Sequence, residues 1–166
     1  MAERISYELT DAEAELLLEL AKDAAGAAGE LGGRIGGGAA GGGGSAGASG
    51  GRRGGRLGAR MTKAQTAAAT VDVPVGPDDA RARARSAIAR LGTGIEDPNG
   101  AGDGSLWGVI PSGVANMSPA LLRVQVEPHG SGARVHLRAS GREALIKQRI
   151  GAKAVDRVAA AIAAGQ

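Results

Sequence analysis

Glycine occupies 17 of the 35 residues from position 26 to position 60, and no other feature of the chain restricts its fold as strongly. The large aliphatic side chains in this stretch are Leu31, Ile35 and Leu57 alone. Ordering the backbone of one residue costs roughly 1–2 kcal/mol, and so few apolar side chains cannot bury enough area to offset that cost. We therefore predict a flexible linker that separates a short N-terminal segment from a C-terminal domain.

The linker divides the chain into three parts. We predict an acidic amphipathic helix within residues 1–25, a Gly/Ala/Arg-rich linker over residues 26–66 and a folded domain over residues 67–166. The domain is long enough for a hydrophobic core. Because the chain has no Phe, one Trp and one Tyr, that core must consist of Val, Ile, Leu and Ala side chains.

Charge is segregated along the chain. Residues 1–30 carry eight acidic and two basic residues, residues 31–69 carry six basic and no acidic ones, and the remainder carries 12 basic and nine acidic ones. Cysteine is absent, which excludes disulfides, thiolate catalysis and Cys-ligated zinc, and fits a reducing compartment. The N-terminus has no secretory pattern and the glycine-rich stretch is too weakly apolar to span a bilayer, so we expect a cytoplasmic protein without a membrane segment.

A helix is predicted in the acidic N-terminal segment. Thr10 and Glu13 match a capping box, in which each side chain accepts a hydrogen bond from the backbone N–H of the other residue. Leu17 lies on the apolar face of this helix, and Leu16 and Leu20 widen that face. A helix this short is marginal in water without something to pack on. We expect it to dock on its own domain, on a second copy of the chain or on a partner protein.

The C-terminal domain begins with a predicted strand at residues 71–75, where Val alternates with Asp and Pro. A helix follows, with Pro77 in its first turn and Gly92 at its C-terminus. Two further strands are predicted at residues 94–97 and 105–110, on either side of a turn-rich stretch.

A β-hairpin over residues 122–139 is the clearest element of the domain, because apolar and polar residues alternate on both sides of its turn. Pairing outward from the turn places Glu127 opposite Arg134, Gln125 opposite His136, and Arg123 opposite Arg138. A final helix is predicted to begin near Ser140, where Glu143 would complete a second capping box. Gly151 in this helix would let another backbone approach closely.

This element order predicts an α+β fold: a small antiparallel sheet with two helices packed on one face, in the order β-α-β(3–4)-α, after the separate N-terminal helix and the disordered Gly-rich linker. The layout is similar to that of the helix-grip proteins (START and Bet v 1-like) and of the half-repeat of TATA-binding protein. A likeness in element order implies a fold and assigns no functional residue.

Trp107 lies on a strand that is apolar on both sides, with Leu106 and Ile110 on one side and Val109 beside the Trp on the other. The second face of the sheet is therefore expected to be covered by loops, by the N-terminal helix or by a partner. From this pattern we predict a partner-binding surface that comprises Leu16, Leu17, Leu20 and Trp107.

Basic residues suggest an alternative, nucleic-acid or polyanion binding. The Gly/Arg tract resembles RNA-binding RGG segments, and the outward side of the hairpin adds further basic side chains. The residues concerned are Arg52, Arg53, Arg56, Arg123, His136 and Arg138. The tract has no aromatic residues nearby for base stacking, so we favour a solvated linker.

Catalytic and metal-binding patterns are weak. The two histidines, His129 and His136, lie in a turn and on a strand without a serine-nucleophile motif nearby. The acidic turn around Asp97 lacks the carboxylate that would close a calcium loop. We therefore predict no catalytic residue, metal site or cofactor, and our leading hypothesis is a non-catalytic binding or scaffolding domain tethered to a protein-interaction helix.

Overall fold

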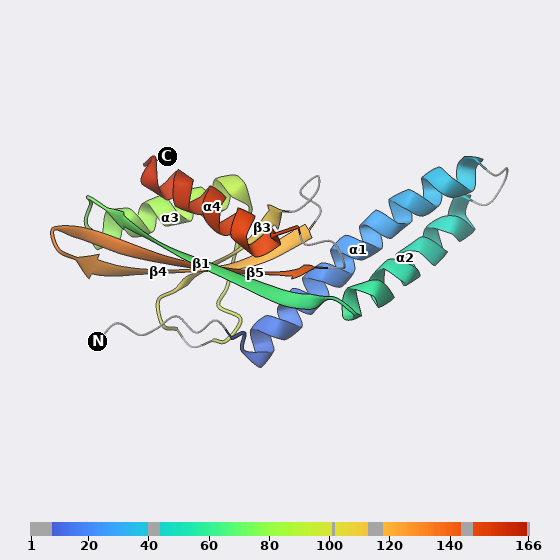
Figure 1. Cartoon of the computed structure of the whole chain (residues 1–166), viewed down its shortest axis with the longest axis horizontal. Coiled ribbons are helices and arrows are strands. Elements are labelled where there is room, and N and C mark those ends of the chain that lie inside the picture. The colour runs from blue at the N-terminus through green and yellow to red at the C-terminus, as the bar shows by residue number, and fades with distance from the viewer. Residues whose placement is uncertain (1–7, 40–43, 101, 113–117, 144–147, 166) are drawn as a thin grey trace.

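The computed structural model describes residues 8–39, 44–100, 102–112, 118–143 and 148–165 of the chain. Its elements are α1 (Asp11–Ala39), α2 (Gly44–Arg60), β1 (Lys63–Val73), α3 (Pro77–Leu91), β2 (Thr93–Ile95), β3 (Leu106–Ser112), β4 (Ser118–His129), β5 (Gly132–Glu143) and α4 (Ile150–Ala163). Helices α1 and α2 lie side by side and extend from one end of the molecule, and the strands with α3 and α4 form the other end (Figure 1). We call the α1–α2 pair the helical hairpin.

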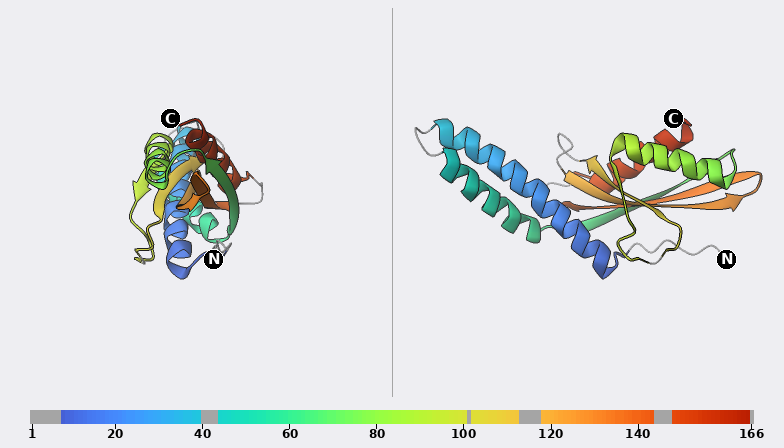
Figure 2. Two further views of the ribbon diagram at one scale, coloured as in Figure 1. Left: turned by 90° about the vertical axis from the view of Figure 1, so that its left-hand side faces the viewer. Right: turned by 180° about the vertical axis from the view of Figure 1, so that it is seen from behind.

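The five strands form one antiparallel sheet in the order β1-β5-β4-β3-β2. Helices α3 and α4 both cover the same face of this sheet (Figure 2). The predicted α+β fold, with two helices on one face of a small antiparallel sheet, is confirmed. Helix α3 begins at Pro77 and stops before Gly92, because Pro suits a first turn and Gly a C-terminus.

The core between the sheet and these two helices is aliphatic, as the composition requires. Its largest fully buried side chains include Ile110 on β3, Leu122 on β4, Leu137 on β5 and Ile162 on α4. Gly151 lets α4 approach β5 closely, since a Cβ at that position would lie 2.6 Å from the carbonyl oxygen of Ala139. The close approach expected at this glycine is therefore present.

The β4–β5 hairpin has the expected register: Glu127 pairs with Arg134, Gln125 with His136, and Arg123 with Arg138. The prediction that the last helix begins near Ser140 is wrong, because β5 continues to Glu143 and α4 begins at Ile150. Ser140 pairs along the strand instead of capping a helix.

Glu143 nevertheless caps α4 from a distance. Its Oε1 accepts a hydrogen bond of 2.6 Å from the backbone N–H of Ile150, the first residue of the helix. A carboxylate at a helix N-terminus is favoured by the helix dipole and satisfies one of the unpaired N–H groups there.

The structure differs from the predicted flexible linker: residues 26–39 continue α1 and residues 44–60 form α2. The reason lies in the small residues. A Cβ on Gly55 would overlap the carbonyl of Ala25, so the two helix backbones touch directly. Backbone-to-backbone van der Waals contact then replaces the large apolar side chains whose absence predicted disorder.

Candidate functional site

The first turns of α1 lie on the face of the sheet that α3 and α4 leave open. Leu17 is fully buried there and packs with Trp107 of β3 and Leu121 of β4. Leu9, Leu16 and Ile95 pack around this cluster and are partly buried. We call residues 8–17 the α1 foot. The apolar face of the N-terminal helix thus docks on its own domain, which is one of the three outcomes that the sequence leaves open.

A buried ion pair fixes the α1 foot. The carboxylate of Glu13 pairs with the guanidinium of Arg138 on β5, and the two side chains are 0% and 3% exposed. Arg138 also donates a 3.0 Å hydrogen bond to the backbone carbonyl of Glu8. The expectation that Arg138 points outward into solvent is wrong, because the α1 foot covers this side of the strand.

The predicted capping box is present and is extended by a loop residue. Thr10 N–H donates to Glu13 Oε2 over 3.0 Å, and Glu13 N–H donates to Thr10 Oγ1 over 3.2 Å. The Thr10 hydroxyl also donates to Asn99 Oδ1 over 2.6 Å, and the Asn99 amide reaches Glu13 Oε1 over 3.4 Å. The β2–β3 loop therefore takes part in holding the α1 foot.

Sequence reasoning identified Leu16, Leu17 and Trp107 as one surface, and the structure brings these residues together. Leu20 lies one turn beyond the foot and is half-buried. Glu13, Arg138 and Asn99 were not recognised as a site, since their contacts join segments about a hundred residues apart in the chain. The sequence signal that could have suggested a covered sheet face here is the apolar side of β3 that carries Trp107.

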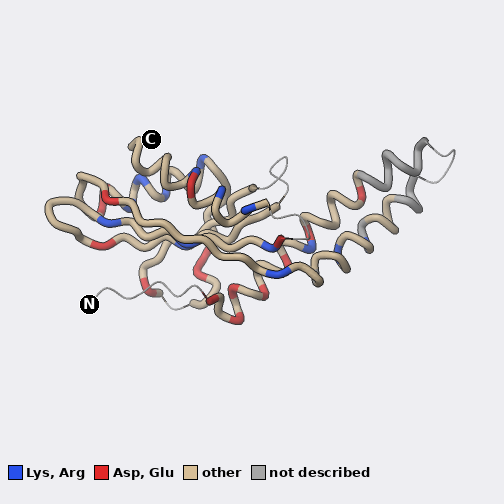
Figure 3. Tube along the Cα trace, viewed as in Figure 1, with Lys and Arg blue, Asp and Glu red and all other residues tan. Residues whose placement is uncertain are grey.

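The remaining charges on the sheet are mostly paired. Arg123 pairs with Asp103 and lies 5.5 Å from the centroid of the Trp107 ring. His136 Nε2 lies 2.9 Å from Glu127 Oε1. Figure 3 shows acidic and basic residues interspersed over the domain.

Several carboxyl groups in these pairs are more acidic than usual. A hydrogen bond from Arg134 lowers the pKa of Asp72, and one from His136 lowers the pKa of Glu127. Burial alone would raise the pKa of Asp103, but hydrogen bonds from Ser105 and the nearby Arg123 lower it overall.

Five of the six residues of the predicted polyanion site have described side chains, and these lie in two places, the sheet and α2. Arg123, His136 and Arg138 each have an acidic partner on or beside the sheet. Arg56 on α2 lies 3.1 Å from Asp23 on α1, and Arg53 is exposed. The side chain of Arg52 lies outside the described part of the chain. The described side chains therefore do not form a continuous basic surface.

Among the residues that the structure describes, exposed large apolar side chains are found only on the helical hairpin and at its end. In the described residues, the large apolar side chains that remain exposed are Leu31 on α1, Leu57 on α2 and Met61 after α2, at 56%, 59% and 88% exposure. The α+β domain has no such residue in its described part.

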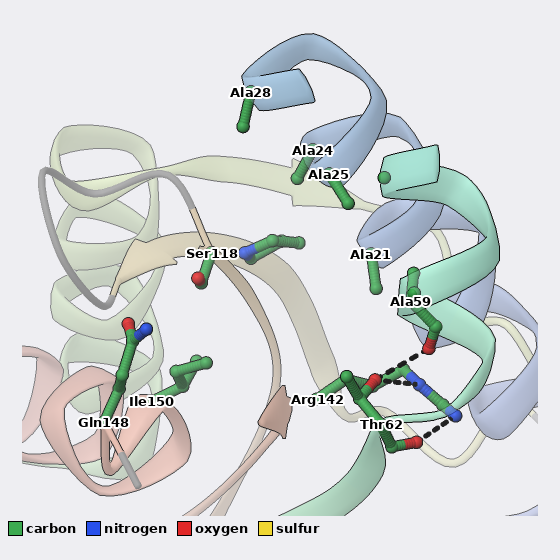
Figure 4. A pocket seen from close by; sticks show the side chains of 13 residues that line it. Ala21, Ala24, Ala25, Ala28, Ala59, Thr62, Ser118, Arg142, Gln148 and Ile150 are labelled. Atoms are coloured by element: carbon green, nitrogen blue, oxygen red, sulfur yellow. Dashed lines mark hydrogen bonds between the residues drawn. The ribbon is translucent and has the colours of Figure 1, made fainter. Parts of the chain in front are cut away.

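A pocket of about 330 Å³ lies where the helical hairpin meets the sheet. Small residues of α1 and α2 form one wall, Ser118, Gln148 and Ile150 stand on the opposite side, and Arg142 lies beside Thr62 (Figure 4). Arg142 turns to the α2–β1 junction, where it bonds the carbonyl of Thr62 and lies 3.2 Å from the Thr62 hydroxyl. Arg142 therefore ties the helical hairpin to the sheet at the edge of this pocket.

The chemistry available in these places is limited. The described residues contain no group of three or more His, Cys, Asp or Glu that could hold a metal ion. His129 lies 2.7 Å from Arg134, and His136 bonds Glu127. Over the same residues, none of the helices combines the length and apolarity needed to cross a membrane.

No protein-family model matches the sequence, and no curated protein does. Among solved structures, the crystal structure of Ara h 8.0201 aligns with 61% of this chain and 97% of its own, at 12% sequence identity and a TM-score of 0.37. A likeness at this level concerns the broad α+β type and assigns no function or site residue to this chain.

Proposed function

We propose that this protein is a non-catalytic binding or scaffolding protein whose helical hairpin contacts a partner protein. The observation that supports the proposal most is the placement of exposed large apolar side chains, since Leu31, Leu57 and Met61 all belong to the hairpin or its end. Such residues are ordinary when scattered over a surface, but here they are confined to the element that extends from the domain (Figure 1).

The α1 foot supports the same proposal because it anchors the helical hairpin, which we also call the arm, on the sheet. Leu17 and the Glu13–Arg138 pair hold α1 on the sheet, and α2 packs on α1 through Gly55. An arm held in this way loses little conformational freedom when a partner binds, which favours affinity.

The test is affinity capture from the native cell with the full chain as bait. The double variant Leu31→Glu/Leu57→Glu places charge at two exposed hairpin positions, so the domain should remain folded with unchanged Trp107 emission. We expect the variant to lose the proteins that the wild-type chain captures. The matched control is Ala82→Glu/Ala160→Glu, which adds the same charge at exposed positions of α3 and α4 and should retain them.

Equal capture by both double variants would contradict a hairpin arm. The competing function, nucleic-acid or polyanion binding through Arg52, Arg53, Arg56 and the basic sheet residues, is separated by salt titration against a DNA or RNA oligomer. Polyanion binding weakens steeply as salt rises, because counterions are released from the phosphates. A protein-interaction arm should give no oligomer binding at any salt concentration.

A further inference from the structure

The two edges of the sheet differ strongly in length. Strand β2 forms one edge and is only three residues long. Strand β1 forms the other edge and runs for eleven residues, from Lys63 to Val73. Its ladder with β5 is continuous, from Lys63 opposite Glu143 to Val73 opposite Ala133, without a bulge. The far side of β1 therefore presents a long, regular row of backbone N–H and C=O groups.

Soluble proteins usually guard such an edge with charged side chains, Pro, bulges, short length or a covering segment. Strand β2 is protected against pairing with another strand because it is short. Strand β1 has none of the sequence guards over residues 64–71, which include neither a charged residue nor Pro. Several of its side chains are exposed, among them Ala64, Gln65, Ala68 and Thr70.

We propose that β1 pairs antiparallel with β1 of a second copy of this chain, around a two-fold axis, so that the two sheets become continuous. A symmetric pairing that uses all eleven residues places Ala68 opposite Ala68 of the other copy. Thr66 then faces Thr70 and Ala67 faces Ala69 across the new ladder. Pairs of Thr side chains stabilise antiparallel strands, and small Ala side chains leave the approach unobstructed.

Charge is compatible with this register. The ionisable residues of β1 are Lys63 and Asp72, near its two ends. Across the two-fold axis, Lys63 stands opposite Val73 and Asp72 opposite Ala64, so no two like charges meet in the new ladder. The interface forms entirely within β1 and does not require the helical hairpin.

A second copy fits this edge better than an unrelated peptide. Peptides that extend a sheet gain affinity from backbone hydrogen bonds and specificity from pockets for alternate side chains. The pocket described above lies at the hairpin and includes no residue of β1. A second copy needs no such pocket, because the two strands have equal length and the pairing closes by two-fold symmetry.

The test is the mass of the full chain in solution, by light scattering or sedimentation over a range of concentrations. We expect a species of twice the 16.3 kDa chain mass. Ala68→Lys would place two like charges opposite each other at the axis and should give monomers. Ala82→Lys adds the same charge at an exposed position of α3 and should leave the dimer intact. An equimolar mixture of Ala68→Lys and Ala68→Glu chains should restore the dimer by opposite charge.

A wild-type chain that stays monomeric at all concentrations overturns the proposal, and so does a dimer that Ala68→Lys leaves unchanged. Hydrogen exchange gives an independent readout, because amides of residues 64–71 should become more protected as dimer forms. The hairpin variant Leu31→Glu/Leu57→Glu should still dimerise. Loss of the dimer in that variant would assign self-association to the hairpin and contradict the β1 interface.

Discussion

Leu17 is the residue whose truncation best tests the docking of the α1 foot. Its side chain is 0% exposed and packs with Trp107 and Leu121 on the sheet. Replacement by Ala removes three carbon atoms, which at about 0.8 kcal/mol per buried methylene corresponds to about 2.4 kcal/mol of transfer free energy. The cavity left behind adds to this, so we expect Leu17→Ala to lower the free energy of unfolding by about 3–4 kcal/mol.

Leu31→Ala is the matched control, because it is the same change on the same helix at a side chain that is 56% exposed. It should alter the free energy of unfolding by no more than about 0.5 kcal/mol. Both variants are compared with the wild type by urea denaturation, followed by far-UV circular dichroism and by the emission of Trp107, the only tryptophan.

Trp107 is 4% exposed, so loosening of the α1 foot should move its emission to longer wavelength before the secondary structure is lost. Equal midpoints for Leu17→Ala and Leu31→Ala, with unchanged emission, would show that α1 does not pack on the sheet. In that case the α1 foot would not anchor the helical hairpin on the domain.

Three further outcomes are expected. In a double-mutant cycle, Glu13→Gln and Arg138→Met should each lower the free energy of unfolding by about 3–5 kcal/mol, and the double variant by less than their sum, because each single change leaves one buried polar partner uncompensated. Gly54→Ala, where a Cβ meets nothing within 4 Å, should stabilise α2 by up to about 1 kcal/mol, whereas Gly55→Ala should lower the melting temperature through a clash with α1. Because the pKa of Asp103 is lowered in the folded state, its carboxylate stabilises the fold at pH values above the ordinary pKa of 3.8. This stabilisation is lost as the pH falls through the lowered pKa, so Asp103→Asn should flatten the acid limb of a stability–pH curve.

The elements of the domain could be predicted from the sequence where the signal lies in neighbouring residues. Alternation fixed the register of β4 and β5 down to the pairing of Glu127 with Arg134. Pro77 and Gly92 marked the two ends of α3, since each suits its position through backbone geometry alone. The extents of β4 and β5 were underestimated, and so was that of β1, because the Ala and Thr residues before Val71 give weak alternation.

Long-range contacts explain what the sequence did not reveal. The burial of Arg138 depends on Glu13, which is 125 residues away and belongs to a helix whose docking site no local pattern specifies. Side-chain area alone predicts a flexible linker over residues 26–60, but direct contact between the helix backbones, as at Gly55, stabilises two helices there. The capping motif at Ser140 matched a helix start, but strand pairing with β1 and β4 prevailed.

The docking of the α1 foot also decides how a partner can be bound. A partner that used Leu17 would have to displace the foot from the sheet and separate Glu13 from Arg138. Breaking a buried pair of this kind costs about 3–5 kcal/mol, before the exposure of Trp107 is added. A partner that contacts Leu31 and Leu57 avoids this cost, because both side chains are already exposed. Binding through the outer surface of the hairpin is therefore favoured over binding through the leucine face that the sequence makes most conspicuous.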